Sequence, residues 1–220
     1  MKRMFTAAAF VLIGLASCGA APPIVSICSM DRDTKGTQVC GRGFTVQDSP
    51  HIITAAHVVK KKGILGIKTR DNIYSLYGYI AFVERAVDAA VIRTRATQPS
   101  GLPLCDPVVD KTENVEIYTQ DGKVMGQTIG ATETELFFRP EVRPGDSGSP
   151  IVSVKRQCVV GVVTGNRYHL KQDGTKAFLW STAAPGNVLK WIIDEGDKFA
   201  NGVMEKIDEN KNKVQPDSKK

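Results

Sequence analysis

Short β-branched and aromatic runs, separated by glycine, proline and aspartate, recur along this chain and restrict its fold more than any other feature. Each run spans a few residues, which is the length of a strand rather than of a helix. Examples are Ile64–Ile67, Ile73–Phe82, Val115–Tyr118 and Phe178–Trp180. The chain has 220 residues, of which 42% are hydrophobic, enough for one compact unit with a full core. The sequence therefore predicts an all-β protein.

One turn, Arg143–Pro150, has the sequence RPGDSGSP and carries a serine between two glycines. The glycine two positions before Ser147 allows the N–H groups of Gly145 and Ser147 to point the same way. A hydroxyl beside two convergent N–H donors suits acyl transfer, because it combines a nucleophile with a binding site for an oxyanion. Taken alone, the same residues also suit a hairpin corner.

Two residues upstream favour the catalytic interpretation. His57 ends a β-branched run and follows two alanines, which leave room for its ring. Asp88 precedes an apolar strand, where a carboxylate can orient an imidazole. Asp71 is the rival carboxylate, but its Asp-Asn pair favours a hairpin turn. The remaining histidines, His51 and His169, are interpreted as solvated loop residues.

The order of these residues distinguishes among serine hydrolases. His57, Asp88 and Ser147 are separated by 31 and 59 positions. In α/β-hydrolases the order is Ser, Asp, His, and in subtilisins it is Asp, His, Ser. The order in this chain is that of chymotrypsin.

Three segments, Thr54–His57, Asp88–Val91 and Gly145–Pro150, resemble the signature segments of trypsin-like serine peptidases. Gly41–Phe44 is similar to the glycine-rich strand of bacterial HtrA-type members. The resemblance covers about residues 24–199. It implies an all-β fold of two six-stranded antiparallel β-barrels with a short C-terminal helix and the active site between the barrels. The expected bounds are about 24–97 and 108–184 for the barrels and 185–199 for the helix, with an interdomain linker near 98–107.

The resemblance also implies a mechanism. Ser147 attacks a peptide or ester carbonyl, His57 takes its proton, and Asp88 holds the imidazole tautomer. The N–H groups of Gly145 and Ser147 form the oxyanion hole, and no metal or cofactor is required. The expected partner is a protein or peptide substrate. The competing hypothesis is a catalytically silent trypsin-fold module that binds a partner at the cell envelope.

Substrate preference is expected to depend on Glu141. The residue six before the nucleophile lies at the base of the family's specificity pocket, and an acidic residue there would attract Lys or Arg. Alternatively, Glu141 is a solvated loop residue that two flanking arginines neutralise. By the same resemblance Thr164, Gly165 and Asn166 line the pocket edge.

Asp146 is expected to depart from the family pattern. In many members its counterpart pairs with a new N-terminus that zymogen cleavage creates. Ile24-Val25 is the candidate here, but Pro23 precedes it and no basic residue for cleavage lies nearby. We therefore expect another partner for Asp146 and an enzyme that is not a conventional zymogen.

The N-terminus resembles a bacterial lipoprotein signal. Lys2-Arg3 precedes a short apolar core, which is typical of a cleaved signal at residues 1–17. The segment Leu15–Cys18 resembles a lipobox, so Cys18 is expected to be lipidated and followed by a linker at residues 18–23. We therefore expect an exported protein that is anchored by a lipid in the periplasm or cell envelope. Gly19 after the cysteine favours the outer membrane.

Four cysteines remain after Cys18, and an even number in an exported protein predicts two disulfides. The residues are Cys28, Cys40, Cys105 and Cys158. The sequence does not choose among three connectivities. Cys28 with Cys40 across a hairpin would leave Cys105 with Cys158, whereas another arrangement joins Cys28 to Cys105.

The net charge of +6 is modest and scattered, which argues against a nucleic-acid partner. Its one basic cluster, Lys60–Lys62, is interpreted as a solvated turn. The charged residues 202–220 are expected to be disordered and are too few for the PDZ domain that HtrA-type proteins usually carry. The expectation is a protease domain alone, of undefined oligomeric state.

Overall fold

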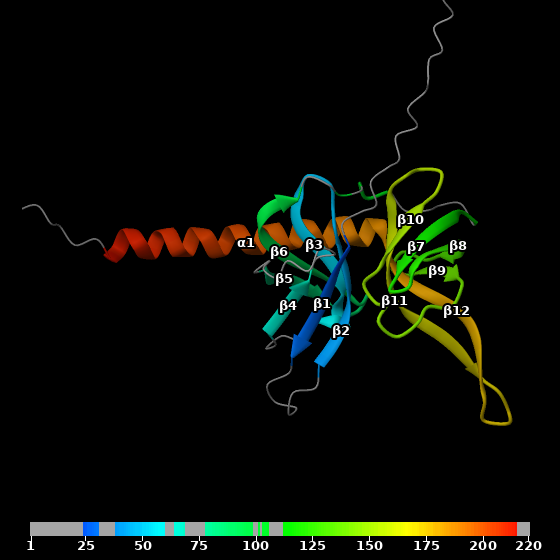
Figure 1. Ribbon diagram of the computed structural model, residues 1–220. Coiled ribbons are helices and arrows are strands. Elements are labelled where there is room, and N and C mark those ends of the chain that lie inside the picture. The colour runs from blue at the N-terminus through cyan, green and yellow to red at the C-terminus, as the bar shows by residue number, and fades with distance from the viewer. Residues whose placement is uncertain are drawn as a thin grey trace, which may run out of the picture.

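The computed structural model describes residues 24–30, 38–59, 64–68, 78–98, 101, 103–105 and 112–214. Within these ranges twelve strands form two antiparallel groups of six, and a long helix follows them (Figure 1). This confirms the all-β fold with two six-stranded antiparallel groups that the resemblance implies. Both groups were expected to be barrels; over the described residues the second is a closed barrel and the first is a six-stranded sheet.

The first group is a six-stranded sheet with the strand order β4-β1-β2-β3-β6-β5. Over the described residues β4 and β5 are its end strands, and a 3-10 turn, η1 (Ala56–Val58), follows β3. The strands are β1 (Ile24–Met30), β2 (Gln38–Thr45), β3 (Ser49–Ala55), β4 (Ile64–Lys68), β5 (Gly78–Glu84) and β6 (Ala89–Gln98).

The second group is a closed barrel with the strand order β10-β11-β12-β9-β8-β7. Strand β10 pairs with both β7 and β11 and so closes the ring. The strands are β7 (Asn114–Thr119), β8 (Gly122–Ala131), β9 (Leu136–Arg139), β10 (Pro150–Ser153), β11 (Val159–Leu170) and β12 (Lys176–Pro185). The far ends of β11 and β12 project from the barrel as a long hairpin (Figure 1).

Apolar side chains join the two groups into one core. Each group has its own buried cluster, and a third cluster contains Phe44 and Ile53 of the first group with Val162 of the second. Helix α1 (Gly186–Val214) contributes Leu189 and Ile192 to this shared cluster. The helix follows the barrel in sequence but packs mainly on β5 and β6, so it fastens one group to the other.

Helix α1 is longer than the sequence predicts, and the expectation of a disordered tail from residue 202 is wrong as far as Val214. The physical reason lies in residues 203–214, which contain no glycine or proline and several strong helix formers. The first proline beyond them is Pro216, and proline disfavours helical backbone at the residue before it.

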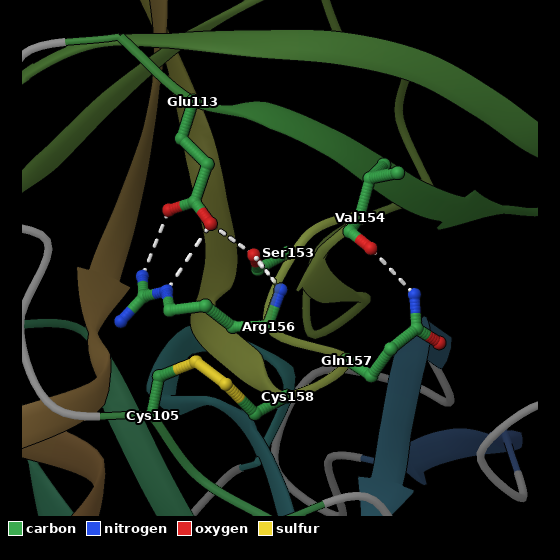
Figure 2. The surroundings of a disulfide bond; sticks show 7 residues. All are labelled: Cys105, Glu113, Ser153, Val154, Arg156, Gln157 and Cys158. Atoms are coloured by element: carbon green, nitrogen blue, oxygen red, sulfur yellow. Dashed lines mark hydrogen bonds and ion pairs between the residues drawn. A yellow bond between two sulfur atoms is a disulfide. The ribbon is translucent and has the colours of Figure 1, made fainter.

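The structure contains two disulfides, in one of the connectivities that the sequence leaves open. Cys28 and Cys40 are directly opposed on β1 and β2, with Cα atoms 4.1 Å apart. Cys105 bridges to Cys158 at a Cα separation of 5.3 Å and so ties the interdomain linker to the start of β11 (Figure 2). Two backbone hydrogen bonds of 2.9 Å reinforce this link, from Cys105 N to Val159 O and from Val159 N to Pro103 O.

A cluster of polar side chains stabilises the turn next to this disulfide (Figure 2). Arg156 donates to both oxygens of Glu113, at 3.1 and 2.8 Å, and Ser153 Oγ donates to the same carboxylate. Burial acts to raise the pKa of Glu113, but the hydrogen bonds from Arg156 and Ser153 outweigh it and lower that pKa. No helix among the described residues is long and apolar enough to cross a membrane.

Candidate active site

His57 and Asp88 lie together at the edge of the first group. His57 Nδ1 is 2.7 Å from Asp88 Oδ2, and the backbone N–H of His57 donates to Asp88 Oδ1 at 2.9 Å. Both carboxylate oxygens therefore orient the same residue. The His57 side chain is 45% exposed, so the ring is accessible from solvent. This is the arrangement that a general base and its orienting carboxylate require.

The backbone of Asp88 has an uncommon conformation. Its φ is 51°, in the left-handed region that aspartate and asparagine tolerate better than most residues. Its carbonyl oxygen accepts a 3.0 Å hydrogen bond from the N–H of Ala56, the residue before His57. Backbone and side chain of Asp88 thus hold the start of η1 in place.

The Ser147 loop belongs to the second group but rests on β2 of the first. The N–H of Arg42 donates to the carbonyl oxygen of Ser147 at 2.7 Å. Gly148 has a φ of 87° and sits so close to the Arg42 carbonyl that a Cβ there would overlap it. Gly41 is equally confined, because its Cβ would lie 2.8 Å from the Ser147 carbonyl oxygen and overlap Val58.

These contacts bring the segments of Ser147 and His57 together. The side chain of Val58, the residue after His57, and the carbonyl oxygen of Ser147 both lie next to Gly41. Over the described residues no hydrogen bond joins the two side chains. In unliganded active sites this bond is often long and tightens only when substrate binds. The structure thus brings His57 and Asp88 into direct contact and places the backbone of Ser147 near the segment that carries His57.

The two expected oxyanion donors lie on a loop of defined shape. Gly145 has a φ of 98°, which only glycine adopts readily. In the part of the chain that the structure describes, neither Gly145 N nor Ser147 N donates to a protein acceptor. The neighbouring N–H groups are occupied: Asp146 N donates to Arg143 O at 3.1 Å, and Gly148 N donates to Val163 O at 2.8 Å. Free donors next to a serine hydroxyl can stabilise a developing oxyanion.

Asp146 has partners within its own barrel. Its side chain is buried, and its carboxylate accepts backbone hydrogen bonds from Gln120 and Arg143, each of 2.9 Å. Ile24, the candidate new N-terminus, instead opens β1 and pairs with Phe44 of β2. Because Gln120 is remote in sequence and ordinary in type, no sequence signal points to it.

A cavity of about 610 Å³ adjoins Ser147. Of the expected pocket residues it contains Glu141, Gly165 and Asn166, but not Thr164. Its complete lining is Glu141, Val142, Arg143, Pro144, Ser147, Gly165, Asn166 and Tyr168.

Hydrogen bonds define the wall of this cavity. Asn166 pairs with the backbone of Val142 in both directions, at 2.7 and 3.2 Å, so its amide builds the wall and is not free for a ligand. Tyr168 Oη donates to Glu141 Oε1 at 2.6 Å, and this bond raises the pKa of the Tyr168 phenol. The sequence analysis missed Tyr168, although alternation along β11 from Asn166 would have placed both on one face.

Thr164 lines a second cavity, of about 310 Å³, which also borders Asp88, Gly165 and Asn166. The two cavities therefore share part of β11 and lie next to each other. Arg85 and Arg167 add positive charge to the smaller one, and Arg167 is paired with Glu135 at 2.7 Å.

His51 contradicts its interpretation as a solvated loop residue. It lies in β3 and is 1% exposed, and its Nδ1 is hydrogen-bonded to Ser49 Oγ at 2.8 Å. Its Nε2 is 3.3 Å from Asp197 Oδ1 on α1. Burial lowers the pKa of His51, while Asp197 acts to raise it and Arg93 to lower it. His169 is exposed, as expected, but it lies in strand β11, where it pairs with Ala177, and not in a loop.

Some of the residues singled out in the sequence lie in parts of the chain that the structure does not describe. Cys18, the signal at residues 1–17 and the cluster Lys60–Lys62 lie outside the described residues. The described residues contain no group of three or more acidic, histidine or cysteine side chains that could hold a metal ion.

The fold is that of the chymotrypsin-type serine proteases. The chain superposes on the Rv3671c protease of M. tuberculosis in its active form with a TM-score of 0.64 and 18% identity, over 79% of this chain and 80% of that one. It superposes on a serine endoprotease of Yersinia pestis with a TM-score of 0.59 and 18% identity, over 81% of this chain and 64% of that one. No protein-family model matches the sequence, and no curated protein does.

Proposed function

We propose that this chain is a serine endopeptidase that hydrolyses peptide bonds through His57, Asp88 and Ser147. The observation that carries the proposal is the doubly hydrogen-bonded His57–Asp88 pair beside a serine loop with two free N–H groups. A binding module would have no need of this combination. The similarity to two serine proteases supports the same class of reaction.

The mechanism follows from these positions. Ser147 Oγ attacks the substrate carbonyl as His57 Nε2 takes its proton, and Asp88 stabilises the imidazolium through Nδ1. The N–H groups of Gly145 and Ser147 bind the resulting oxyanion. His57 then protonates the leaving amine, which leaves an acyl group on Ser147. Water, deprotonated by His57, attacks this acyl-enzyme and releases the acid and the free serine.

The cavity beside Ser147 is the proposed site for the side chain before the cleaved bond. Glu141 would favour lysine or arginine there, because Tyr168 occupies one of its carboxylate oxygens and leaves the other. A peptide-library cleavage profile tests this preference. Cleavage with no enrichment of basic residues would reject it.

We further propose an exported protein that is anchored to a membrane through lipidated Cys18, at the cell envelope. The two disulfides support an oxidising compartment. Cys18→Ala should abolish labelling of the protein by radioactive palmitate, and persistent labelling would refute the anchor.

Labelling with a fluorophosphonate probe tests the enzymatic proposal. Wild type should be labelled, whereas Ser147→Ala and His57→Ala should not. Ser149→Ala is the matched control, because Ser149 lies in the same loop and its buried hydroxyl has no hydrogen-bond partner among the described residues. This variant should keep its labelling. A folded wild type that does not react would leave the silent binding module as the function.

A further inference from the structure

The carboxylate of Asp146 is buried next to the proposed oxyanion hole, with only 3% of the residue exposed. A buried charge is costly unless hydrogen bonds compensate it. Gln120 N supplies one such bond to Oδ1 and Arg143 N another to Oδ2. Arg143 is on the same loop as Asp146, so Gln120 is the donor that ties this loop to another part of the barrel.

Gln120 lies in a turn that is well suited to hold a loop. Strand β7 ends at Thr119 and β8 begins at Gly122, so the turn contains only Gln120 and Asp121. Thr119 pairs with Gly122 across its base, and Thr119 Oγ1 donates to Gly122 O at 2.9 Å. The positive φ that the turn needs, 127°, is at Gly122. A hairpin this short has little conformational freedom.

The Gln120 side chain makes a second contact with the same loop. Its Oε1 lies 2.9 Å from the position that a Cβ on Gly145 would occupy. The carboxamide therefore packs against Gly145, whose N–H is one of the two proposed oxyanion donors. Asp121 adds an ion pair with Arg143 at 2.8 Å, but both side chains are more than two-thirds exposed. Exposed pairs contribute little.

We propose that Gln120 is a positioning residue for the oxyanion hole. Its N–H fixes the Asp146 carboxylate and its side chain supports Gly145, so that the N–H groups of Gly145 and Ser147 point to one site. The inference rests on the proposed serine-peptidase function. It implies that the β7–β8 turn gives the loop its active shape and that no liberated N-terminus is needed.

Gln120→Pro in the full chain tests the backbone contact. Proline lacks the N–H but suits the first position of a turn whose positive φ lies at the glycine. We expect kcat for a peptide ester to fall about 10²-fold, the effect of a small misplacement of catalytic groups. KM should change little. Affinity for a peptide boronic acid, which forms an oxyanion-like adduct, should fall in parallel with kcat, while affinity for the product peptide should not.

Two further variants complete the test. Gln120→Ala keeps the N–H and should lower kcat less than Gln120→Pro does. Asp121→Ala is the matched control in the same turn and should leave kcat within about two-fold, since it removes only an exposed ion pair. If Gln120→Pro does not fold, Asp146→Asn replaces it as the test of the positioning role. Asparagine keeps the shape of the side chain, but its NH2 cannot accept a hydrogen bond from one of the two backbone N–H donors.

The outcomes separate the two proposals. A wild type that neither reacts with fluorophosphonate nor cleaves peptides rejects the peptidase, and the positioning role with it. An active wild type whose folded Gln120→Pro and Asp146→Asn variants keep kcat within about three-fold rejects the positioning role alone. A parallel loss of kcat and boronic acid affinity at unchanged product affinity supports it.

Discussion

Two histidines six positions apart each face an aspartate, yet their surroundings give them different roles. His57 lies 2.7 Å from Asp88, and its side chain is 45% exposed. His51 lies 3.3 Å from Asp197, and its side chain is 1% exposed. Both belong to one stretch of chain, β3 and η1, so the difference arises from what packs against each ring.

The buried pair is structural. His51 on β3 and Arg93 on β6 both approach Asp197 on α1, and Arg93 donates to Asp197 at 2.6 Å. The pair therefore fixes the C-terminal helix to the first sheet. In the exposed pair, His57 Nδ1 is bound to Asp88, and His57 Nε2 has no protein partner over the described residues. A histidine–aspartate pair is thus a candidate base only where the second nitrogen can reach a substrate.

Alanine substitution of the two histidines should separate these roles most strongly. His57→Ala should lower kcat by about 10⁴-fold or more, because the proposed general base is lost. Its melting temperature should change little, since the side chain is half exposed. His51→Ala is the control and should keep the kcat of the folded fraction. Steady-state kinetics and thermal melts measure the two effects. A large loss of kcat in His51→Ala, with little change in His57→Ala, would contradict this division of roles.

The aspartates provide the second test. Asp88→Asn keeps the shape and tolerates the positive φ, but its NH2 cannot accept the Nδ1 proton. In a triad this tautomer change costs about 10⁴-fold in kcat. Asp197→Asn should leave kcat unchanged. Ester hydrolysis by both variants measures the contrast, and equal losses would show that Asp197 also supports catalysis.

The proposed catalytic residues could be picked out from the sequence because each stands in a local pattern that carries its own chemistry. His57 follows small residues, Asp88 precedes an apolar strand, and Ser147 is flanked by the glycines that the turn needs. Their order along the chain then selects one fold. The all-β class follows from short β-branched runs for the same reason, since a strand of this kind is encoded locally. The division into two groups of six followed instead from the resemblance to trypsin-like peptidases.

Contacts between distant segments could not be predicted. His51 follows Pro50, which suggests a loop edge, but its burial depends on Asp197 in a helix at the other end of the chain. Likewise Asp146 finds Gln120 only because β7 and β8 form a tight hairpin beside it. The helix beyond residue 202 was missed because its composition is charged, although its propensity is helical.

His51→Ala should also destabilise the protein. It removes a fully buried side chain and its contacts with Ser49 and Asp197, which costs about 2–4 kcal/mol in comparable large-to-small substitutions. Urea denaturation at neutral pH measures the loss. Ser49→Ala, which removes only the hydroxyl partner, should cost about 1 kcal/mol. A His51→Ala variant as stable as wild type would mean that the buried pair does not fasten α1.

The pH dependence of stability gives the smallest and most specific effect. Burial lowers the pKa of His51 below its ordinary value of 6.5, so the folded state holds the proton less tightly than the unfolded state does. The contribution of the neutral ring to stability is therefore complete above pH 6.5 and is lost as the pH falls through the folded pKa. The free energy of unfolding falls by at most about 1.4 kcal/mol per pH unit in this range. Glu113, whose pKa is also lowered, contributes only below its ordinary value of 4.5. Urea denaturation from pH 7.5 down to about pH 5 should show a smaller decline for His51→Gln than for wild type, because glutamine does not titrate. Identical declines would assign the pH dependence of stability to groups other than His51.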